Sequence, residues 1–170
     1  MIESDFKAVF EEYRDTIYHF AWRMTNSQDK AEDITQDVFL SLLSHPARFD
    51  ATRGQMRSFL LGIARNLALK RFRKDKNRWN ALEGEDFVAQ PVDIAGRETA
   101  DIVGAAVQAL PPFQREVLVL AQYEGLSLEE IARSVEAEVG TVKSRLHRAR
   151  ENLRRMLGPL KERVERSSRL

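Results

Sequence analysis

Apolar residues recur every three or four positions along most of this 170-residue chain, which is the period of an α-helix with one buried face. Three such stripes occupy residues 6–24, 31–43 and 59–72. No segment alternates apolar and polar residues between turn signals, as a half-buried strand does. The sequence therefore predicts an all-α fold.

Polar residues mark where the predicted helices begin. Ser27 can cap the second helix, because its hydroxyl can accept a hydrogen bond from a first-turn N–H group. Thr52 and Gln55 have the spacing of a capping box and predict the start of the third helix. Ser127 and Glu130 repeat that spacing in the second half of the chain and predict another helix start there.

The helical spacing fades in an acidic stretch that contains Gly84, Pro91 and Gly96. Glycine and proline favour turns over helix interiors, so this stretch is expected to be a flexible linker between two helical domains. A helical pattern returns after it. The expected organisation is a helical domain over residues 1–79, the linker over 80–98, a second helical domain over 99–160 and a frayed basic tail over 161–170.

The composition argues against several kinds of site. The chain has no cysteine, and its three histidines lie far apart in the sequence. No phosphate-binding loop or nucleophile–base pair is visible, and the adjacent acids Glu32 and Asp33 diverge on a helix. We therefore expect no enzymatic activity, no metal and no cofactor.

The amino terminus does not resemble a signal peptide and no run approaches ~18 apolar residues, so we expect a cytoplasmic protein without membrane insertion.

The net charge of +1 conceals a strong segregation of charge. Residues 51–80 hold nine basic residues and one acidic residue, and residues 141–170 hold ten basic and three acidic residues. The three stretches between and before them are all net negative. Basic blocks of this kind are candidate surfaces for nucleic acid, although two ordinary solvated helix faces would give the same count.

Residues 127–150 have the spacing of a helix-turn-helix motif. Ala132 is small where the two helices must cross, and Val142, Leu146 and Ala149 share one face of the second helix. The opposite face is polar and basic, as in a helix that reads the major groove, whereas an ordinary αα-hairpin is the alternative. The residues of this surface are Thr141, Lys143, Ser144, His147 and Arg148.

Arg145 of the same helix is interpreted differently. It precedes the inward-facing Leu146 and can turn toward the preceding helix. We expect an ion pair with Glu129 or Glu130 rather than a contact with a base.

Longer strings of the sequence resemble a known family. LPPFQREVLVLAQYEGLSLEEIARSVEAEVGTVKSRLHRARENLRRML resembles region 4 of the sigma-70 family, specifically of its extracytoplasmic-function (ECF) group. KAEDITQDVFLSLL at 30–43 resembles region 2.2, and FLLGIARNLALKRFRK at 59–74 resembles regions 2.3 and 2.4. The matches follow the order and spacing of the family.

The resemblance implies a transcription initiation factor with two kinds of partner. The first is core RNA polymerase, through the clamp helices of its largest subunit and the flap of its second-largest subunit. The second is promoter DNA, at its −10 and −35 elements. The resemblance implies that the polar and basic surface of the helix-turn-helix, from Thr141 to Arg148, binds the −35 element, and we call this surface the −35 face. Members of the family are commonly held inactive by an anti-sigma factor, but the sequence does not reveal one. The acidic linker would either thread the channel of the nascent RNA or serve as a plain tether.

The resemblance also assigns roles to residues of the first domain. In the family, the second helix meets the polymerase clamp, and a loop at 48–57 captures a base flipped out of the −10 element. We call the polymerase-binding residues the acidic strip; they are Asp29, Glu32, Asp33, Gln36 and Asp37. The expected −10 residues are Arg53, Gln55, Arg57, Arg65, Asn66, Lys70, Arg73 and Lys74.

Three positions depart from the pattern of the family. Glu136 stands where a glycine is common in the turn of the motif, and Glu138 stands where a proline is common before the recognition helix. If residue 136 is left-handed, a non-glycine side chain costs about 1 kcal/mol there. Lys70 replaces a frequent aspartate, so the promoter preference of the family does not transfer at that position.

A different function remains possible from the residues alone. A helix-turn-helix repressor or activator would bind duplex operator DNA without polymerase, as a dimer on half-sites about one helical turn apart. The basic block at 51–80, together with the acidic strip, favours the sigma factor over this alternative.

Overall fold

The computed structural model describes residues 3–74 and 82–169, without the side chains of residues 73 and 74. Every regular element within these residues is helical, which confirms the predicted all-α fold. The elements are α1 (Glu3–Thr25), α2 (Gln28–Ser44), the short 3₁₀ turn η1 (Pro46–Arg48), α3 (Met56–Lys74), α5 (Thr99–Ala109), α6 (Pro112–Gln122), α7 (Leu128–Ser134), α8 (Val139–Met156) and α9 (Gly158–Ser168).

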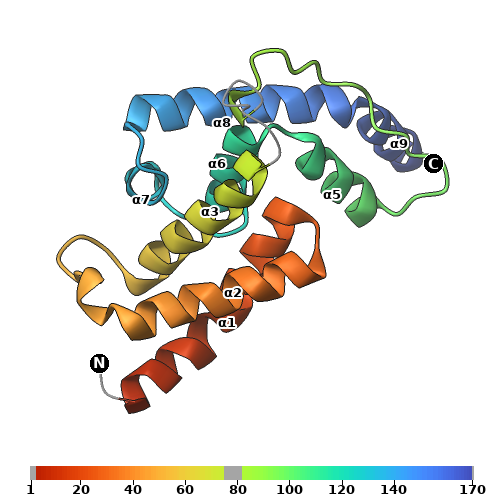
Figure 1. Cartoon of the computed structure of the whole chain (residues 1–170). Coiled ribbons are helices and arrows are strands. Elements are labelled where there is room, and N and C mark those ends of the chain that lie inside the picture. The colour runs from red at the N-terminus through yellow and green to blue at the C-terminus, as the bar shows by residue number, and fades with distance from the viewer. Residues whose placement is uncertain (1–2, 75–81, 170) are drawn as a thin grey trace.

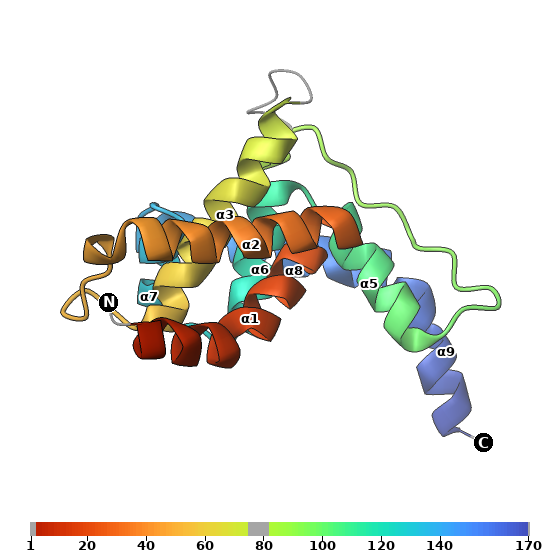
Figure 2. The same cartoon turned by 60° about the horizontal axis from the view of Figure 1, so that its bottom comes forward.

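Helices α1, α2 and α3 form an amino-terminal unit, with α1 and α2 lying side by side across α3 (Figures 1 and 2). Ser27 caps α2 as predicted, because its hydroxyl accepts a hydrogen bond from the backbone N–H of Lys30 at 3.3 Å. The predicted apolar stripes of α1 and α2 are buried against each other, as at Phe20, Ile34 and Val38.

The predicted capping box before α3 is wrong. The hydroxyl of Thr52 donates to Asp50 Oδ1 at 2.6 Å, and the N–H of Thr52 donates to the same oxygen at 2.9 Å. This turn occupies the threonine, and α3 begins later, at Met56. Thr52 is therefore bonded to Asp50, two residues before it, and does not cap α3.

Helices α5 to α9 form a carboxyl-terminal unit. Here the predicted capping box is confirmed, since Ser127 and Glu130 exchange side-chain-to-backbone hydrogen bonds at the start of α7. Ile131 and Val142 are fully buried where α7 crosses α8, as the helix-turn-helix spacing predicts. The end of the chain differs from the expected frayed tail: residues 158–168 form α9, which is held by the burial of Leu160.

The two units pack directly on each other, which the sequence did not predict. Helix α3 packs against α7, and α1 packs against α5 and α6 (Figure 2). Most of the buried apolar residues of the two units join in one continuous core, to which the amino-terminal unit contributes Leu61 and the carboxyl-terminal unit Leu118. Leu69, Leu82 and Phe113 form a second, smaller cluster. Gly62 lies at this contact, where a Cβ atom would be in van der Waals contact with Ser134, 3.4 Å from its backbone oxygen.

The chain between the units is irregular from Gly84 to Glu98 and follows α8 and α9 (Figure 1). The N–H of Val92 donates to the carbonyl of Met156 at 2.9 Å. The guanidinium of Arg163 donates to the carbonyls of Ile94 and Arg97 at 3.3 and 3.2 Å. Helices α8 and α9 therefore hold the linker at three of its carbonyl and amide groups.

Candidate functional site

The acidic strip lies on the open side of α2. Its five side chains are all exposed, whereas Ala31, Ile34 and Val38 of the same helix are fully buried. This division follows from the 3.6-residue period, which places the acidic residues off the buried stripe. The strip can meet a basic partner without any change in the fold.

The −35 face is also open. All five of its residues are exposed on the first three turns of α8, and Val142, Leu146 and Ala149 on the opposite side are buried. Ser144 donates to the carbonyl of Gly140 at 3.1 Å, within the same helix. Glu136, in the turn before α8, has φ +54° and is therefore in the left-handed conformation, although it is not a glycine.

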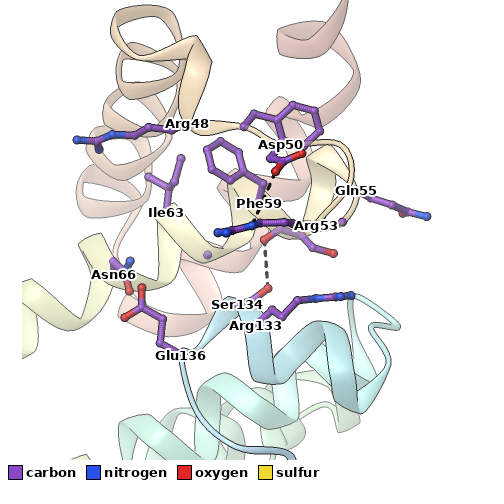
Figure 3. Close-up of a pocket in the computed structure, with 14 residues that line it drawn as sticks. Arg48, Asp50, Arg53, Gln55, Phe59, Ile63, Asn66, Arg133, Ser134 and Glu136 are labelled. Atoms are coloured by element: carbon purple, nitrogen blue, oxygen red, sulfur yellow. Dashed lines mark hydrogen bonds and ion pairs between the residues drawn. The ribbon is translucent and has the colours of Figure 1, made fainter.

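A pocket of about 430 Å³ opens beside the loop before α3 (Figure 3). Phe59, Ile63 and Asn66 of α3 line one part of it, and Arg53 lies between Phe59 and the carboxyl-terminal unit. The pocket combines an aromatic ring with amide and guanidinium donors, which suits a planar base with polar edges. Its full lining is Arg48, Phe49, Asp50, Arg53, Gly54, Gln55, Ser58, Phe59, Gly62, Ile63, Asn66, Arg133, Ser134 and Glu136.

The expected −10 residues fall into three groups. Arg53, Gln55, Asn66 and Lys70 are exposed, and the first three line the pocket. Arg57 and Arg65 instead bind carboxylates of the carboxyl-terminal unit. The side chains of residues 73 and 74 lie outside the described part of the structure.

Arg65 is buried and forms a two-point ion pair with Glu116 of α6. Its Nε lies 2.7 Å from Glu116 Oε2, and its Nη2 lies 3.0 Å from Oε1. Burial raises the pKa of Glu116, although the hydrogen bonds and charge of Arg65 oppose that rise. The geometry is that of a bidentate arginine–carboxylate pair, in which both partners are removed from water.

Arg57 pairs with a second buried carboxylate, Glu124, which follows α6. The distance from Arg57 Nη2 to Glu124 Oε2 is 2.7 Å. Arg23 of α1 lies 3.9 Å from the other oxygen of Glu124, and its guanidinium stacks over the ring of Tyr123 at 4.2 Å. Two arginines of the amino-terminal unit thus converge on one glutamate.

Arg145 makes a structural ion pair, but the expected partner is wrong. Its Nη2 lies 2.8 Å from Oε1 of Glu83 at the start of the linker, and its guanidinium lies over the ring of Phe113 at 4.4 Å. Glu130 is occupied by the cap of α7 and by Ser58.

Glu116 and Glu124 had no predicted role from the sequence. The signal for Glu116 was its position on an apolar stripe, three residues after Phe113 and four before Leu120. A carboxylate there is buried and needs a cationic partner. A second signal was the net negative charge of residues 111–140 beside the basic block at 51–80.

Two negative findings concern the described residues. Within them, no group of three or more His, Cys, Asp or Glu side chains could hold a metal ion. None of the described helices is long and apolar enough to span a lipid bilayer.

Comparison with known proteins agrees with this arrangement of two units. Residues 9–78 match the family model of Sigma-70 region 2, and residues 100–153 match that of Sigma-70, region 4. The chain is 33% identical over 169 residues to the ECF RNA polymerase sigma factor SigW of Bacillus subtilis, covering 91% of this chain and 90% of SigW. It is 34% identical over 152 residues to the ECF sigma factor SigE of Mycolicibacterium smegmatis, covering 84% of this chain and 58% of SigE.

A solved structure is similar over nearly the same length. The sigma factor RpoE of Bartonella quintana, crystallised with the anti-sigma factor NepR, has a TM-score of 0.70 and 28% identity, covering 91% of this chain and 97% of RpoE. The chain therefore belongs to the sigma-70 family of RNA polymerase sigma factors. Within that family it is a member of the ECF group.

Proposed function

We propose that this chain binds core RNA polymerase through the acidic strip of α2. It then directs the polymerase to promoters through the −10 residues of the amino-terminal unit and the −35 face of α8. The observation that carries this proposal is the separation of charge on exposed faces: acidic residues on α2 in one unit, and cationic and polar residues on α8 in the other. The polymerase and the −35 element can therefore be bound at the same time by surfaces that do not overlap.

We assign the amino-terminal unit to the −10 element and to the polymerase clamp, and the carboxyl-terminal unit to the −35 element. Arg53, Gln55 and Asn66 line a pocket of suitable size for one base, which supports their role at a flipped nucleotide. Arg148 projects from the exposed face of α8 and has the donor geometry to bridge guanine O6 and N7. The chain has no catalytic role in this function and acts by binding alone.

An anti-sigma factor is a further proposed partner. RpoE of Bartonella quintana was crystallised with one, and the match covers 91% of this chain. That likeness supports a regulatory partner of the same kind here.

Run-off transcription tests the function. Purified chain and core polymerase from the source organism are incubated with genomic fragments, and discrete transcripts that require both components are expected. Tight binding of the chain alone to duplex DNA, with no transcript in the presence of core polymerase, would instead support the helix-turn-helix repressor.

A further inference from the structure

The first described residues of the linker are packed against the helices that follow them. We call Leu82, Glu83 and Gly84 the anchor segment. The side chain of Leu82 is buried in the smaller apolar cluster, together with Leu69 of α3 and Phe113 of α6. The anchor segment is therefore fixed in place, in contrast to the exposed Val88 only a few residues later.

Gly84 fits closely against the start of α6. Its φ is +80°, in the left-handed region that favours glycine. A Cβ atom at this position would lie 2.8 Å from Cβ of Pro111 and closer still to Cγ of the same ring. A larger residue therefore has to push the anchor segment away from α6.

Glu83 forms the ion pair of Arg145, a buried arginine of α8. Glu83 Oε1 lies 2.8 Å from Nη2 of Arg145, and the side chains of the arginine and the glutamate are 10% and 24% exposed. The guanidinium also lies over the ring of Phe113, at 4.4 Å from its centre. The charge of Arg145 also reaches Glu116, but both oxygens of that carboxylate are bound by Arg65. Glu83 is therefore the carboxylate that neutralises Arg145.

Arg145 lies on the same turns of α8 as the −35 face. It follows Ser144 directly and precedes Arg148 by three residues, and both of these neighbours are exposed. A side chain that reads a base edge must be held in position by the packing and hydrogen bonds behind it. The pair between Glu83 and Arg145 supplies such a support behind the −35 face.

A second connection joins the anchor segment to α8 two turns further along. The amide of Gln114, a buried residue of α6, donates to the carbonyl of Glu83 at 3.5 Å. Its oxygen accepts a hydrogen bond from Nδ2 of Asn152 at 2.7 Å. The linker, α6 and α8 are thus joined at two points along the recognition helix.

We propose that Glu83 is a positioning residue for recognition of the −35 element: its carboxylate holds Arg145 against α6, which fixes the DNA-reading turns of α8 and keeps this cation away from DNA phosphates. The inference rests on the proposed function, because it assumes that α8 reads the −35 element. The linker then contributes to promoter selectivity although Glu83 itself does not touch DNA.

Holoenzyme assembled from the full chain and core polymerase tests this role. Its affinity is measured for a promoter found by run-off transcription and for two altered copies, one with a changed −35 element and one with a changed −10 element. With Glu83→Gln, the preference for the natural −35 element should fall roughly 5-fold, a partial loss of the discrimination that a bidentate base contact supplies. The preference at the −10 element and binding to core polymerase should be unchanged.

The dependence of affinity on salt provides a second readout. A buried arginine that loses its carboxylate is left without compensation, so the freed Arg145 should turn outward to a DNA phosphate. The slope of log affinity against log salt concentration should then steepen by about 0.9 with Glu83→Gln. The double variant Glu83→Gln with Arg145→Gln has no cation to release and should return the slope to its natural value.

Gly84→Ala tests the same role without changing a charge. The added Cβ atom displaces the anchor segment from Pro111, so the −35 preference should fall and the salt slope should steepen as with Glu83→Gln. Gly96→Ala is the matched control, because Gly96 lies in the same linker at φ +68° and has open space around its Cβ position. Its −35 preference and salt slope should stay natural. Circular dichroism checks that each variant is folded.

Three results would overturn the proposal. The first is a fall in stability with Glu83→Gln while the −35 preference and the salt slope stay natural, because the ion pair would then be structural only. The second is an equal fall in preference at both promoter elements, and the third is a salt slope that stays steep in the double variant. If holoenzyme with the natural chain shows no promoter preference at all, the proposed function itself fails.

Discussion

The guanidinium of Arg115, at the start of α6, donates a hydrogen bond to the main-chain carbonyl of Met24, in the last turn of α1. The same side chain donates to the carbonyls of Gln108 and Leu110 at 2.8 and 2.9 Å. Burial lowers the pKa of Arg115 to about 10, which still leaves the group charged at neutral pH. One buried cation therefore satisfies carbonyl groups at the ends of two helices and joins the two units.

Replacement of Arg115 should be strongly destabilising. Arg115→Ala leaves buried carbonyl groups without a donor, and we expect the free energy of unfolding to fall by about 3 kcal/mol. Urea denaturation followed by circular dichroism measures this change. Arg155→Ala, at an exposed position near the end of α8, is the matched control and should change the value by less than about 0.5 kcal/mol. An equal effect of the two substitutions would contradict a structural role of Arg115.

Replacement of Glu136, the left-handed residue in the turn of the helix-turn-helix, should instead stabilise the protein. Glu136→Gly should raise the free energy of unfolding by about 0.5–1 kcal/mol, because glycine adopts φ +54° without steric cost. The same change at Glu129, within α7, should lower it by about 1 kcal/mol, because glycine destabilises a helix. The two variants are compared by urea denaturation. A loss of stability at both positions would mean that the carboxylate of Glu136 contributes more than its backbone conformation costs.

The acidic strip should mediate binding to core polymerase. Asp33→Arg with Asp37→Arg reverses two charges on the exposed face of α2, and we expect co-purification with core polymerase to be lost while helicity is unchanged by circular dichroism. The double change Glu162→Arg with Glu165→Arg on α9 is a control of equal charge and should keep binding. Unchanged binding by the α2 variant would contradict the assignment of this face.

The −35 face should discriminate bases through Arg148. Arg148→Ala should relax the preference at one or two adjacent base pairs of the −35 element, since a bidentate contact to guanine contributes about 1–3 kcal/mol of discrimination. Arg154→Ala, further along α8, should at most weaken binding evenly and reduce its dependence on salt. Transcription from a set of −35 variants with core polymerase measures both effects. An equal loss from every variant with Arg148→Ala, or a loss of core binding, would contradict the assignment.

The linker should be the first site of proteolysis in the free chain. Thermolysin cuts before large apolar residues, and Val88 is 67% exposed in an irregular segment. We therefore expect the first cut within residues 80–98. Arg163→Ala removes the hydrogen bonds to Ile94 and Arg97 and should accelerate cleavage there. First cuts inside α5 or α6, with the linker intact, would contradict the expected order.

Local patterns predicted much of the local structure. The apolar stripes located the helices of both units except α9, which was expected to be a frayed tail. The side chains of Ser27, Ser127 and Glu130 marked helix starts that the structure contains. These predictions succeeded because a helix is stabilised by groups three and four residues apart. The prediction at Thr52 failed for an equally local reason, since Oδ1 of Asp50 accepts hydrogen bonds from both the hydroxyl and the N–H of Thr52.

The sequence by itself determined the helices before α9, the two units and which residues of α2 and α8 face outward, because each of these depends on the period of one helix. Only the tertiary structure decided that the units close on each other. That contact pairs Arg65 with Glu116 and Arg57 with Glu124, and it brings Gly62 against Ser134. Each of these pairs joins residues 51 or more positions apart. The sequence shows that acidic and basic segments are present, but it does not show which residues pair. The partners are chosen by packing, which brings Arg65 to the buried carboxylate of Glu116 and both Arg57 and Arg23 to that of Glu124.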